Sequence, residues 1–553
     1  MTFGVLVCLV QGAQGASPDR VTVPSREHRQ DALTARPLHQ PILPAFEFDP
    51  GLEAERLSTS AGYHVQRVEF HGHTAVPDAE LAELGARYAG RVLNFRDLIA
   101  LRDEVTLLYI DRGYVTSGAV IRSLRGDVLS VEVIEGSLAG IEVTSDGRFR
   151  EDYIAGYLNG FGPMEPVNVL HVEERLQLLQ QDAHVARVEA QLLPGQHRGS
   201  SLLHVRPIEN KPWAVRVEAS NHLSPAVGGW QGLFAVDALN LTGRGDDLHL
   251  GVRGSEGLEE ISAEYAFPIG ARGTRLSVYG FAADSEIVTD PFADLDIEAE
   301  SRTYGLRLSH PLRRSLDVQS NLSLNFEWRE SETFLLGSGF SFVDGPEEGV
   351  AEIAVVRAGW ERLQRTQRDV FAGRVELSAG LNAFGATQSS GDTPDGEFFK
   401  ALVQLQWARR MDFLTSQLVL RTDAQLSNDP LLGLEQIAVG GRWTVRGYRE
   451  NTLIRDSAVI SSLEWRVPIV RDVRGINRLE LRPFVDWSHS WNHSRAEIGP
   501  RELVSAGIGV HWEPLDGVRA ELYWGEALND VDYPGKYDLQ DDGVHFRFTW
   551  EAL

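Results

Sequence analysis

The sequence predicts an α+β region of two repeats, followed by a C-terminal all-β region that crosses a membrane as an antiparallel barrel. Three observations support this fold class. Residues 63–210 carry the order strand, helix, helix, strand, strand twice, which indicates an internal repeat. Residues 211–553 carry long segments in which apolar and polar side chains alternate, as they do in the wall of a membrane barrel. Between two such segments, residues 445–448 read Val-Arg-Gly-Tyr.

The N-terminal part of the chain predicts a targeting segment and a linker. The apolar run FGVLVCLV and the small residues after it resemble a secretory signal peptide, expected at 1–16, although no Lys or Arg precedes the run. The run holds Cys8, the only cysteine, so a cleaved chain crosses an oxidising periplasm without disulfide mispairing. Within 17–62, a short polar helix is expected at 25–36, and prolines favour an extended linker after it.

Length and charge narrow the possible classes of protein. A chain of 553 residues has room for two to four domains. It contains no run of 18 apolar residues, so no membrane-spanning helix is expected. The net charge of −26 argues against nucleic acid as a partner and is expected on solvated loops and a polar barrel interior.

The first repeat is expected at 63–137 and the second at 138–210. In the first repeat the longer helix has apolar residues at helical spacing, and Gly113-Tyr114 then turns the chain into two strands. The elements of the first repeat are expected, in order, at 64–70, 77–90, 95–111, 116–124 and 128–136. Those of the second repeat are expected at 139–147, 150–160, 168–181, 185–195 and 200–210.

The barrel prediction depends on the length of the alternating segments. Residues 316–328 alternate without a break, with aliphatic and aromatic side chains on one side and polar ones on the other. A strand of a soluble sheet averages about 5–6 residues, whereas a tilted membrane strand needs about 9–11. Five tryptophans on the apolar side of such segments fit an aromatic girdle at a membrane interface. They are Trp465, Trp487, Trp512, Trp524 and Trp550.

The two repeats resemble the POTRA module, a small periplasmic domain. The resemblance is carried by Tyr-Ile-Asp-Arg-Gly-Tyr at 109–114, where the second helix ends, and by Val-Ile-Glu-Gly at 133–136, in the last strand. A different small domain with the same order of elements is the alternative. A module of this kind exposes a sheet edge and a groove beside a helix, and an extended peptide can add to either.

POTRA-like repeats followed by a barrel that bears Val-Arg-Gly-Tyr resemble the TpsB transporters of two-partner secretion, the haemolysin and filamentous-adhesin secretion proteins. The resemblance spans residues 64–553 and includes local matches at 240–246, 265–270 and 310–314. It implies a sixteen-stranded outer-membrane barrel at 211–553, periplasmic POTRA modules and an N-terminal plug helix within 17–62.

The resemblance also implies a functional loop and a partner motif on the barrel wall. The loop motif is Val445, Arg446, Gly447 and Tyr448, and the wall motif is Phe484, Asp486 and Ser488. The family has glycine where Ser488 stands. Alternation along 478–488 directs Asp486 toward the lumen, so a loop that enters the barrel brings Arg446 to Asp486 with bidentate geometry. The alternative is an exposed loop arginine beside an unrelated acid of the lumen.

The sequence predicts no catalytic residue, cofactor site or metal site, and therefore no enzyme. No arrangement of nucleophile and base is evident. The densest group of histidines, His71 and His73, is expected in a solvated turn and lacks a nearby cysteine. The many acids and arginines of the predicted strands are expected to line a hydrated lumen.

The leading hypothesis is an outer-membrane pore that exports, and in some cases activates, a large partner protein such as a haemolysin or adhesin. The POTRA repeats would capture this partner unfolded in the periplasm, and outer-membrane lipid and the barrel-assembly machinery are the other expected partners. One alternative is an assembly factor for outer-membrane proteins, which usually carries more POTRA modules. Others are a passive porin or small-molecule receptor, which needs neither the repeats nor the loop motif, and an enzyme embedded in a barrel.

Overall fold

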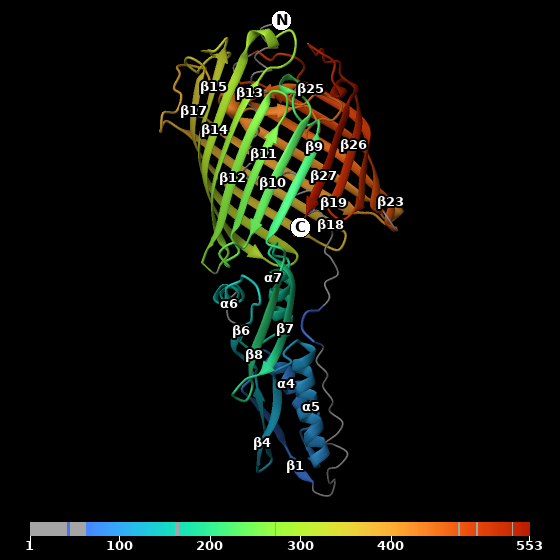
Figure 1. The fold of residues 1–553 in the computed structure, drawn as a ribbon. Helices are drawn as coiled ribbons and strands as arrows, with labels where there is room; N and C mark the ends of the chain where they lie inside the picture. Colours follow the sequence, from blue (N-terminus) through green and yellow to red (C-terminus); the bar gives the residue numbers. More distant parts are fainter. Residues whose placement is uncertain are drawn as a thin grey trace. The chain divides into compact units, whose positions relative to one another are not determined.

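The chain forms two units, and the structure, a computed structural model, describes most of both (Figure 1). The described residues are 41–44, 62–160, 165–270, 272–473, 476–493, 496–533 and 535–552. The predicted signal peptide and the predicted plug helix lie outside these ranges. Within them, no helix is long and apolar enough to cross a membrane.

The first module of the N-terminal unit has the predicted order of elements, with two additions. Its sheet has the order β2-β5-β4, with β2 parallel to β5, and a two-stranded sheet pairs β1 with β3. The single strand predicted at 64–70 is wrong, because the chain breaks at Gln66, whose N–H donates to the carbonyl of Asp127 at 2.8 Å. The elements are β1 (Tyr63–Val65), β2 (Arg67–His71), α4 (Asp78–Ala86), β3 (Arg91–Leu93), α5 (Phe95–Asp111), β4 (Gly118–Arg125) and β5 (Val128–Ile134).

Local sequence explains the ends of α5 and the turn beside it. Asn94 and Asp97 form a capping box at the start of α5, each side chain accepting the other's backbone N–H. Glu135 accepts hydrogen bonds from the N–H of Ala75 at 2.7 Å and from the Tyr109 hydroxyl at 2.9 Å, which ties the turn before α4 to the end of β5. Burial raises the pKa of the Glu135 carboxyl, but these hydrogen bonds outweigh it and hold that pKa below its ordinary value.

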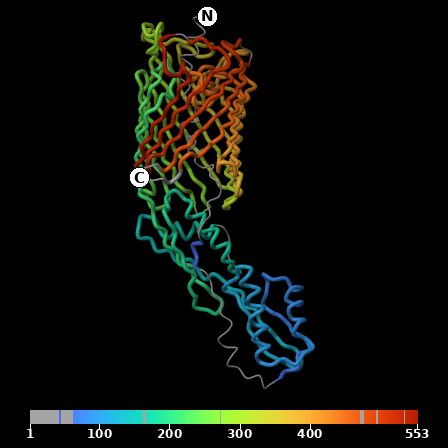
Figure 2. Tube along the Cα trace, turned by 90° about the vertical axis from the view of Figure 1, so that its right-hand side faces the viewer, coloured from blue at the N-terminus to red at the C-terminus, as the bar shows by residue number. Residues whose placement is uncertain are grey.

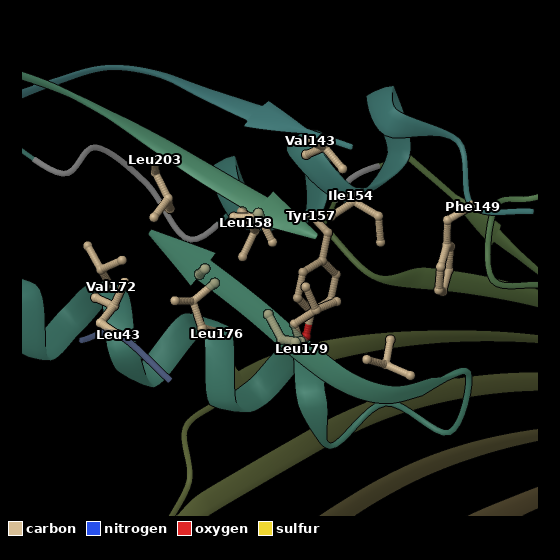
Figure 3. Close-up of a cluster of buried hydrophobic side chains, with 14 of the residues drawn as sticks. Leu43, Val143, Phe149, Ile154, Tyr157, Leu158, Val172, Leu176, Leu179 and Leu203 are labelled. Atoms are coloured by element: carbon tan, nitrogen blue, oxygen red, sulfur yellow. The ribbon is translucent and has the colours of Figure 1, made fainter. Parts of the chain in front are cut away.

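The second module repeats this plan. Its sheet has the order β6-β8-β7, with β6 parallel to β8, and its helices pack their apolar side chains against that sheet. Figure 3 shows part of the resulting core. The elements are β6 (Ser137–Val143), α6 (Glu151–Asn159), α7 (Val169–Gln180), β7 (Val185–Pro194) and β8 (Ser200–Glu209).

The C-terminal unit is a closed antiparallel barrel, whose strands run from green to red in Figure 2. It has the sixteen strands that the family resemblance implied, and the two-residue β16 (Ser338–Gly339) adds only to the end of β15. The barrel closes where the last strand, β27, pairs with the first, β9. The first eight strands are β9 (Trp213–Ser220), β10 (Gln231–Leu239), β11 (Asp247–Gly254), β12 (Leu258–Ile269), β13 (Thr274–Glu286), β14 (Ile297–Arg314), β15 (Val318–Leu335) and β17 (Val350–Arg365). The others are β18 (Asp369–Leu381), β19 (Phe399–Arg410), β20 (Gln417–Ser427), β23 (Ser457–Val473), β24 (Ile476–Trp491), β25 (Glu502–Leu515), β26 (Val518–Ala527) and β27 (Val544–Ala552).

The wall of the barrel follows the predicted alternation. On β24, Val485 and Trp487 are exposed on the outer face, whereas Glu480, Arg482 and Asp486 are buried on the inner face. The strand predicted at 316–328 is β15, which begins two residues later and continues seven residues further. The segment matched at 240–246 connects β10 to β11, and those at 265–270 and 310–314 lie at the ends of β12 and β14.

The long connection between β20 and β23 carries the Val-Arg-Gly-Tyr sequence. It contains a one-turn 3₁₀ helix, η5 (Gly433–Glu435), and a short antiparallel pair made by β21 (Ile437–Val439) and β22 (Leu453–Arg455). The residues between β21 and β22 form a loop that is buried along almost its whole length. This loop is called the 440–452 loop below.

Candidate functional site

Arg446 makes five hydrogen bonds to the barrel wall, four from its guanidinium and one from its backbone N–H. Nε and Nη2 donate to the two carboxylate oxygens of Asp486, each at 2.8 Å, and the Arg446 N–H donates to Asp486 Oδ2 at 3.0 Å. Nη1 donates to Glu464 Oε2 at 2.6 Å, and Nη2 also donates to Ser462 Oγ at 2.9 Å. The predicted bidentate contact between Arg446 and Asp486 is therefore present, and the loop enters the barrel.

Aromatic rings enclose the same guanidinium. Arg446 Cζ lies 3.5 Å from the ring centroid of Phe484 and 5.1 Å from that of Tyr523. A cation over an aromatic face gains about 2 kcal/mol when both are shielded from water. Phe484 of the predicted wall motif thus contacts the loop arginine directly, together with Asp486.

The two buried carboxylates around Arg446 each have an arginine partner. Arg466 Nε donates to Glu464 Oε1 at 2.9 Å, so two arginines face the carboxylates of Glu464 and Asp486. All four side chains are at least nine-tenths buried. Removing ions from water is costly, and a buried cluster is stable only when every charge has a partner. Each member of this cluster therefore depends on the others.

Gly447 lets the loop approach the wall closely. Its φ of +92° is a conformation that residues with a side chain rarely adopt, and a Cβ placed there would lie 2.8 Å from the carbonyl oxygen of Gly525 on β26. Gly440 and Gly441 also have positive φ, at the start of the loop. These glycines allow the sharp turns by which Arg446 reaches the wall.

Val445 and Tyr448 seat the loop by packing and hydrogen bonding. Both are fully buried in an apolar cluster that includes Leu453 and Leu503. The Tyr448 hydroxyl donates to the carbonyl of Val504 at 2.8 Å and accepts the N–H of Asn529 at 3.1 Å. The four residues of the loop motif thus have distinct parts: two in packing, one in backbone geometry and one in charge.

Ser488, the last residue of the predicted wall motif, lies on the same face of β24 as Asp486 but takes no part in the hydrogen bonds of Arg446. Its side chain is fully buried, and Oγ has no hydrogen-bond partner among the described residues. A buried hydroxyl without a partner costs about 1–3 kcal/mol. The structure therefore brings six of the seven predicted residues into the loop and its seat, and leaves Ser488 beside them.

A second charged anchor, which the sequence did not reveal, holds the base of the same connection. The fully buried carboxylate of Glu435, in η5, contacts cations from three strands of the wall. They are Arg329 Nη1 at 2.8 Å, Arg357 Nη2 at 2.7 Å and Lys400 Nζ at 2.7 Å. Each cation occupies an inward position of its strand, but only the register between strands reveals that the three converge.

A third contact ties the end of the loop to the segment before β27. Arg449 Nη2 donates to Asp541 Oδ2 at 2.7 Å, and the N–H of Glu450 donates to Gln540 Oε1 at 2.8 Å. Asp541 and Gln540 belong to the 3₁₀ helix η6 (Leu539–Asp542). No sequence signal links these segments, which lie 90 residues apart.

These ion pairs and hydrogen bonds position the 440–452 loop. Within the ranges that the structure describes, no group of three or more His, Cys, Asp or Glu side chains is placed to hold a metal ion. His73 of the predicted solvated turn lies 2.6 Å from Asp78 Oδ1, and His71 is exposed. The buried charges of the barrel pair with one another and place the 440–452 loop.

Comparison with known proteins identifies the family. The haemolysin secretion/activation protein family ShlB/FhaC/HecB matches residues 199–512, and the ShlB-type POTRA domain matches residues 63–136. The chain belongs to this family. It is an outer-membrane transporter of two-partner secretion, with a barrel in the outer membrane and POTRA modules in the periplasm. The family is one of secretion pores, which supports export over the assembly-factor, porin, receptor and enzyme alternatives.

Curated relatives agree with this assignment, and solved structures share the fold. The outer membrane transporter CdiB of Escherichia coli O6:K15:H31 is 25% identical over 82% of this chain and 78% of the relative. The hemolysin transporter protein ShlB of Serratia marcescens is 23% identical over 77% of this chain and 74% of the relative. The structure of CdiB from Escherichia coli matches 99% of this chain and 98% of that chain, with a TM-score of 0.66 and 20% identity. BamA from Haemophilus ducreyi lacking POTRA domains 1–3 shares the fold, with a TM-score of 0.55 and 12% identity over 89% of this chain.

Proposed function

We propose that this transporter captures an unfolded partner protein on its two periplasmic modules and passes it through the barrel lumen, and that the 440–452 loop must be seated for export to proceed. The partner is a large secreted protein of the haemolysin or adhesin kind. The proposal assigns the chain no catalytic step and no cofactor. Outer-membrane lipid and the barrel-assembly machinery are the other partners it requires.

The observation that carries the proposed role of the loop is the buried cluster around Arg446. A loop that only connects two strands at the surface needs no buried charge, because water solvates its polar groups. Here Arg446 is removed from water and balanced by Asp486 and Glu464. Removing one member of such a cluster costs about 3–5 kcal/mol, so the cluster favours one seated position of the loop strongly over others.

The position of the loop explains why its seat would control export. Arg446 contacts β23 and β24, while Gly447 and Tyr448 contact β26 and β25. One loop therefore joins four consecutive strands from inside the barrel. A polypeptide that passes through the lumen shares that space with the loop, so the position of the loop determines the width and polarity of the passage.

Co-expression tests the export proposal. Cells that produce this chain together with its partner, a large secreted protein of the haemolysin or adhesin kind, should release that protein into the medium, and cells without this chain should retain it. The matched control is a partner that lacks its N-terminal region, which should be retained in both strains. If release is unchanged by loss of this chain while the amounts of other outer-membrane proteins fall, the chain acts as an assembly factor and the export proposal is wrong.

A further inference from the structure

A short part of the connection between β18 and β19 leaves the barrel wall. The strand pairing of β17 with β18 ends at Ala354 and Leu381, and a further contact forms where the N–H of Thr387 donates to the carbonyl of Glu352 at 2.9 Å. One residue of β17 separates these two contacts, whereas five residues, 382–386, separate them on the other side. These five residues therefore lie outside the ladder, and they are called the 382–386 segment below.

The 382–386 segment lies over the outer face of the wall. Alternation along β15 points Phe326 and Trp328 outward, and Ala354 is the direct neighbour of Trp328 on β17. The indole N–H of Trp328 donates to the carbonyl of Phe384 at 3.2 Å, and the ring centroids of Phe384 and Phe326 lie 5.5 Å apart. Ala354 also faces outward but is 0% exposed, which fits a segment that covers it.

Phe384 lies within the apolar band of the outer face. The outward side chains of β15 change from aromatic to acidic between Trp328 and Glu330, and Phe384 contacts Phe326, on the apolar side of this boundary. The Phe384 side chain is nevertheless 71% exposed, and its φ of +56° is a conformation that bulky residues rarely adopt. The backbone therefore holds an aromatic side chain outward at a level where the wall itself is apolar.

The turn between β19 and β20, residues 411–416, folds outward in the same way. Trp465 points outward from β23, and its indole N–H donates to Ser416 Oγ at 3.0 Å. Its ring stacks on that of Phe413, with centroids 6.1 Å apart. Phe413 and Leu414 are 62% and 53% exposed, and Leu414 has a φ of +53°. This turn, called the 411–416 segment below, repeats the two features of the first: an indole donor and an exposed apolar side chain on a left-handed backbone.

The two segments belong to opposite ends of the barrel. The first strand follows directly after the periplasmic modules in the chain, so every odd-numbered strand of the barrel runs toward the outside. The 382–386 segment follows the ninth strand and is extracellular, whereas the 411–416 segment follows the tenth and is periplasmic. Both flank β19, so they lie on the same part of the wall, away from the pair β27 and β9 that closes the barrel.

We propose that these two segments anchor the barrel in lipid at both surfaces of the membrane, with Phe384 inserted on the extracellular side and Phe413 and Leu414 on the periplasmic side. The wall around them lies in the membrane, so the segments continue an existing contact with acyl chains. Trp328 and Trp465 hold the segments there, because an indole ring is apolar while its N–H needs a hydrogen-bond acceptor. The inference concerns lipid and does not depend on the export proposal.

Spin-label accessibility in vesicles tests both anchors. The full-length transporter with Cys8→Ala, which removes its only cysteine, is reconstituted in phosphatidylethanolamine and phosphatidylglycerol. A nitroxide on Phe384→Cys or Leu414→Cys should be relaxed more by oxygen, which concentrates in lipid, than by a water-soluble nickel chelate. The controls are Ser390→Cys and Asp412→Cys, at exposed positions of the same two connections, where the chelate should act more strongly. Chelate relaxation at 384 and 414 equal to that at the controls would overturn the proposal.

A matched pair of tryptophan substitutions tests how the 382–386 segment is held. Trp328→Phe keeps an apolar ring but removes the N–H that donates to Phe384, so chelate relaxation of the label at position 384 should rise toward that of the control at position 390. Trp360→Phe should leave it unchanged, because the Trp360 N–H donates to Ser320 Oγ within the wall at 2.9 Å. If the two variants behave alike, Trp328 does not hold the segment and that part of the proposal is wrong.

A second pair tests the 411–416 segment. Trp465→Phe should raise chelate relaxation of the label at position 414, because it removes the N–H that donates to Ser416. Trp487→Phe, at an outward position of the neighbouring strand β24, should not. Equal effects of the two substitutions would contradict the role of Trp465. Neither label reports on export, so failure of the anchors leaves the export proposal standing.

Discussion

Substitution of Arg446 by alanine should abolish most export while the barrel still folds. The substitution removes the guanidinium from between Asp486 and Glu464, whose side chains are 0% and 9% exposed, and leaves both carboxylates without their main partner. Breaking a buried charge cluster costs about 3–5 kcal/mol. At ~1.4 kcal/mol per factor of ten, the seated position of the loop loses at least about a hundredfold in population. The strand pairs that close the barrel do not include Arg446, so the wall itself remains.

Related substitutions separate charge from geometry. Arg446→Lys should restore export only in part, because lysine keeps the charge but cannot donate to Asp486 and Glu464 with the planar geometry of arginine. Asp486→Arg should block export, because it places two arginines side by side. The sequence alone predicts that combining Arg446→Asp with Asp486→Arg recovers part of the export. The structure reduces that expectation, because an aspartate at 446 would face Glu464.

The assay is the amount of partner protein in the medium, normalised to the amount of heat-modifiable, folded barrel in the outer membrane. Arg302→Ala is the matched control, because its ion pairs with Glu300 and Glu330 are exposed and contribute about 0–1 kcal/mol. Normal export by the Arg446→Ala variant would show that export does not require the seated loop. Loss of the folded barrel in that variant would show that the cluster supports assembly of the barrel instead.

Gly447→Ala should reduce export without loss of the barrel, because a left-handed backbone costs alanine about 1–2 kcal/mol and the alanine Cβ would overlap the carbonyl of Gly525. Gly525→Ala should reduce export in the same assay, because its Cβ would meet the backbone of Gly447. Glu435→Gln should lower both export and the temperature at which the barrel unfolds on a gel. It removes an anion that three buried cations share, at about 3–5 kcal/mol, although Arg357 keeps its ion pair with Glu327. The first module should lose stability as the pH falls below about 4, because folding lowers the pKa of the Glu135 carboxyl. The ionised carboxylate contributes its full stabilisation above the ordinary pKa of a glutamate. This stabilisation is lost as the pH falls through the lowered pKa of the folded state. Hydrogen exchange over residues 63–136 measures this loss, and Glu135→Gln should remove its pH dependence.

Much of the fold follows from local patterns in the sequence. The helix α5 begins and ends where the apolar spacing predicts, because its capping box and its apolar face act within a few residues. The strand β24 faces lumen and lipid as its alternation predicts, because the side-chain period of a strand is two. The break at Gln66 escaped prediction, because it depends on a hydrogen bond to Asp127, which lies 61 positions further along the chain.

Only part of the site around Arg446 could be predicted, and that part came from the family resemblance rather than from local patterns alone. The family resemblance and the alternation of side chains together paired Arg446 with Asp486. Alternation shows which side chains of a strand face the lumen, but not which side chains of the adjacent strand lie beside them. Glu464 was missed because only the register between β23 and β24 places it near Asp486. Glu435 was missed because its partners come from three strands of the wall. The segment 41–44 was expected to be a plain linker, and only the packing of Leu43 against α7 reveals its contact with the second module.

Crosslinking of a stalled partner protein from inside the barrel tests whether the partner passes through the lumen. Gln404 and Leu405 are neighbours on β19; Gln404 is partly buried and donates a hydrogen bond to the buried, inward-facing Asp423, whereas Leu405 is 40% exposed on the outer face. A photoreactive residue is placed at each position in otherwise identical transporters, and export is halted by a folded domain at the end of the partner. The two transporters should then differ in the amount of crosslinked partner. Passage through the lumen should give crosslinks to the partner from position 404 and none from position 405. Continued export with no crosslink from position 404, or with equal crosslinks from both positions, would contradict passage through the lumen.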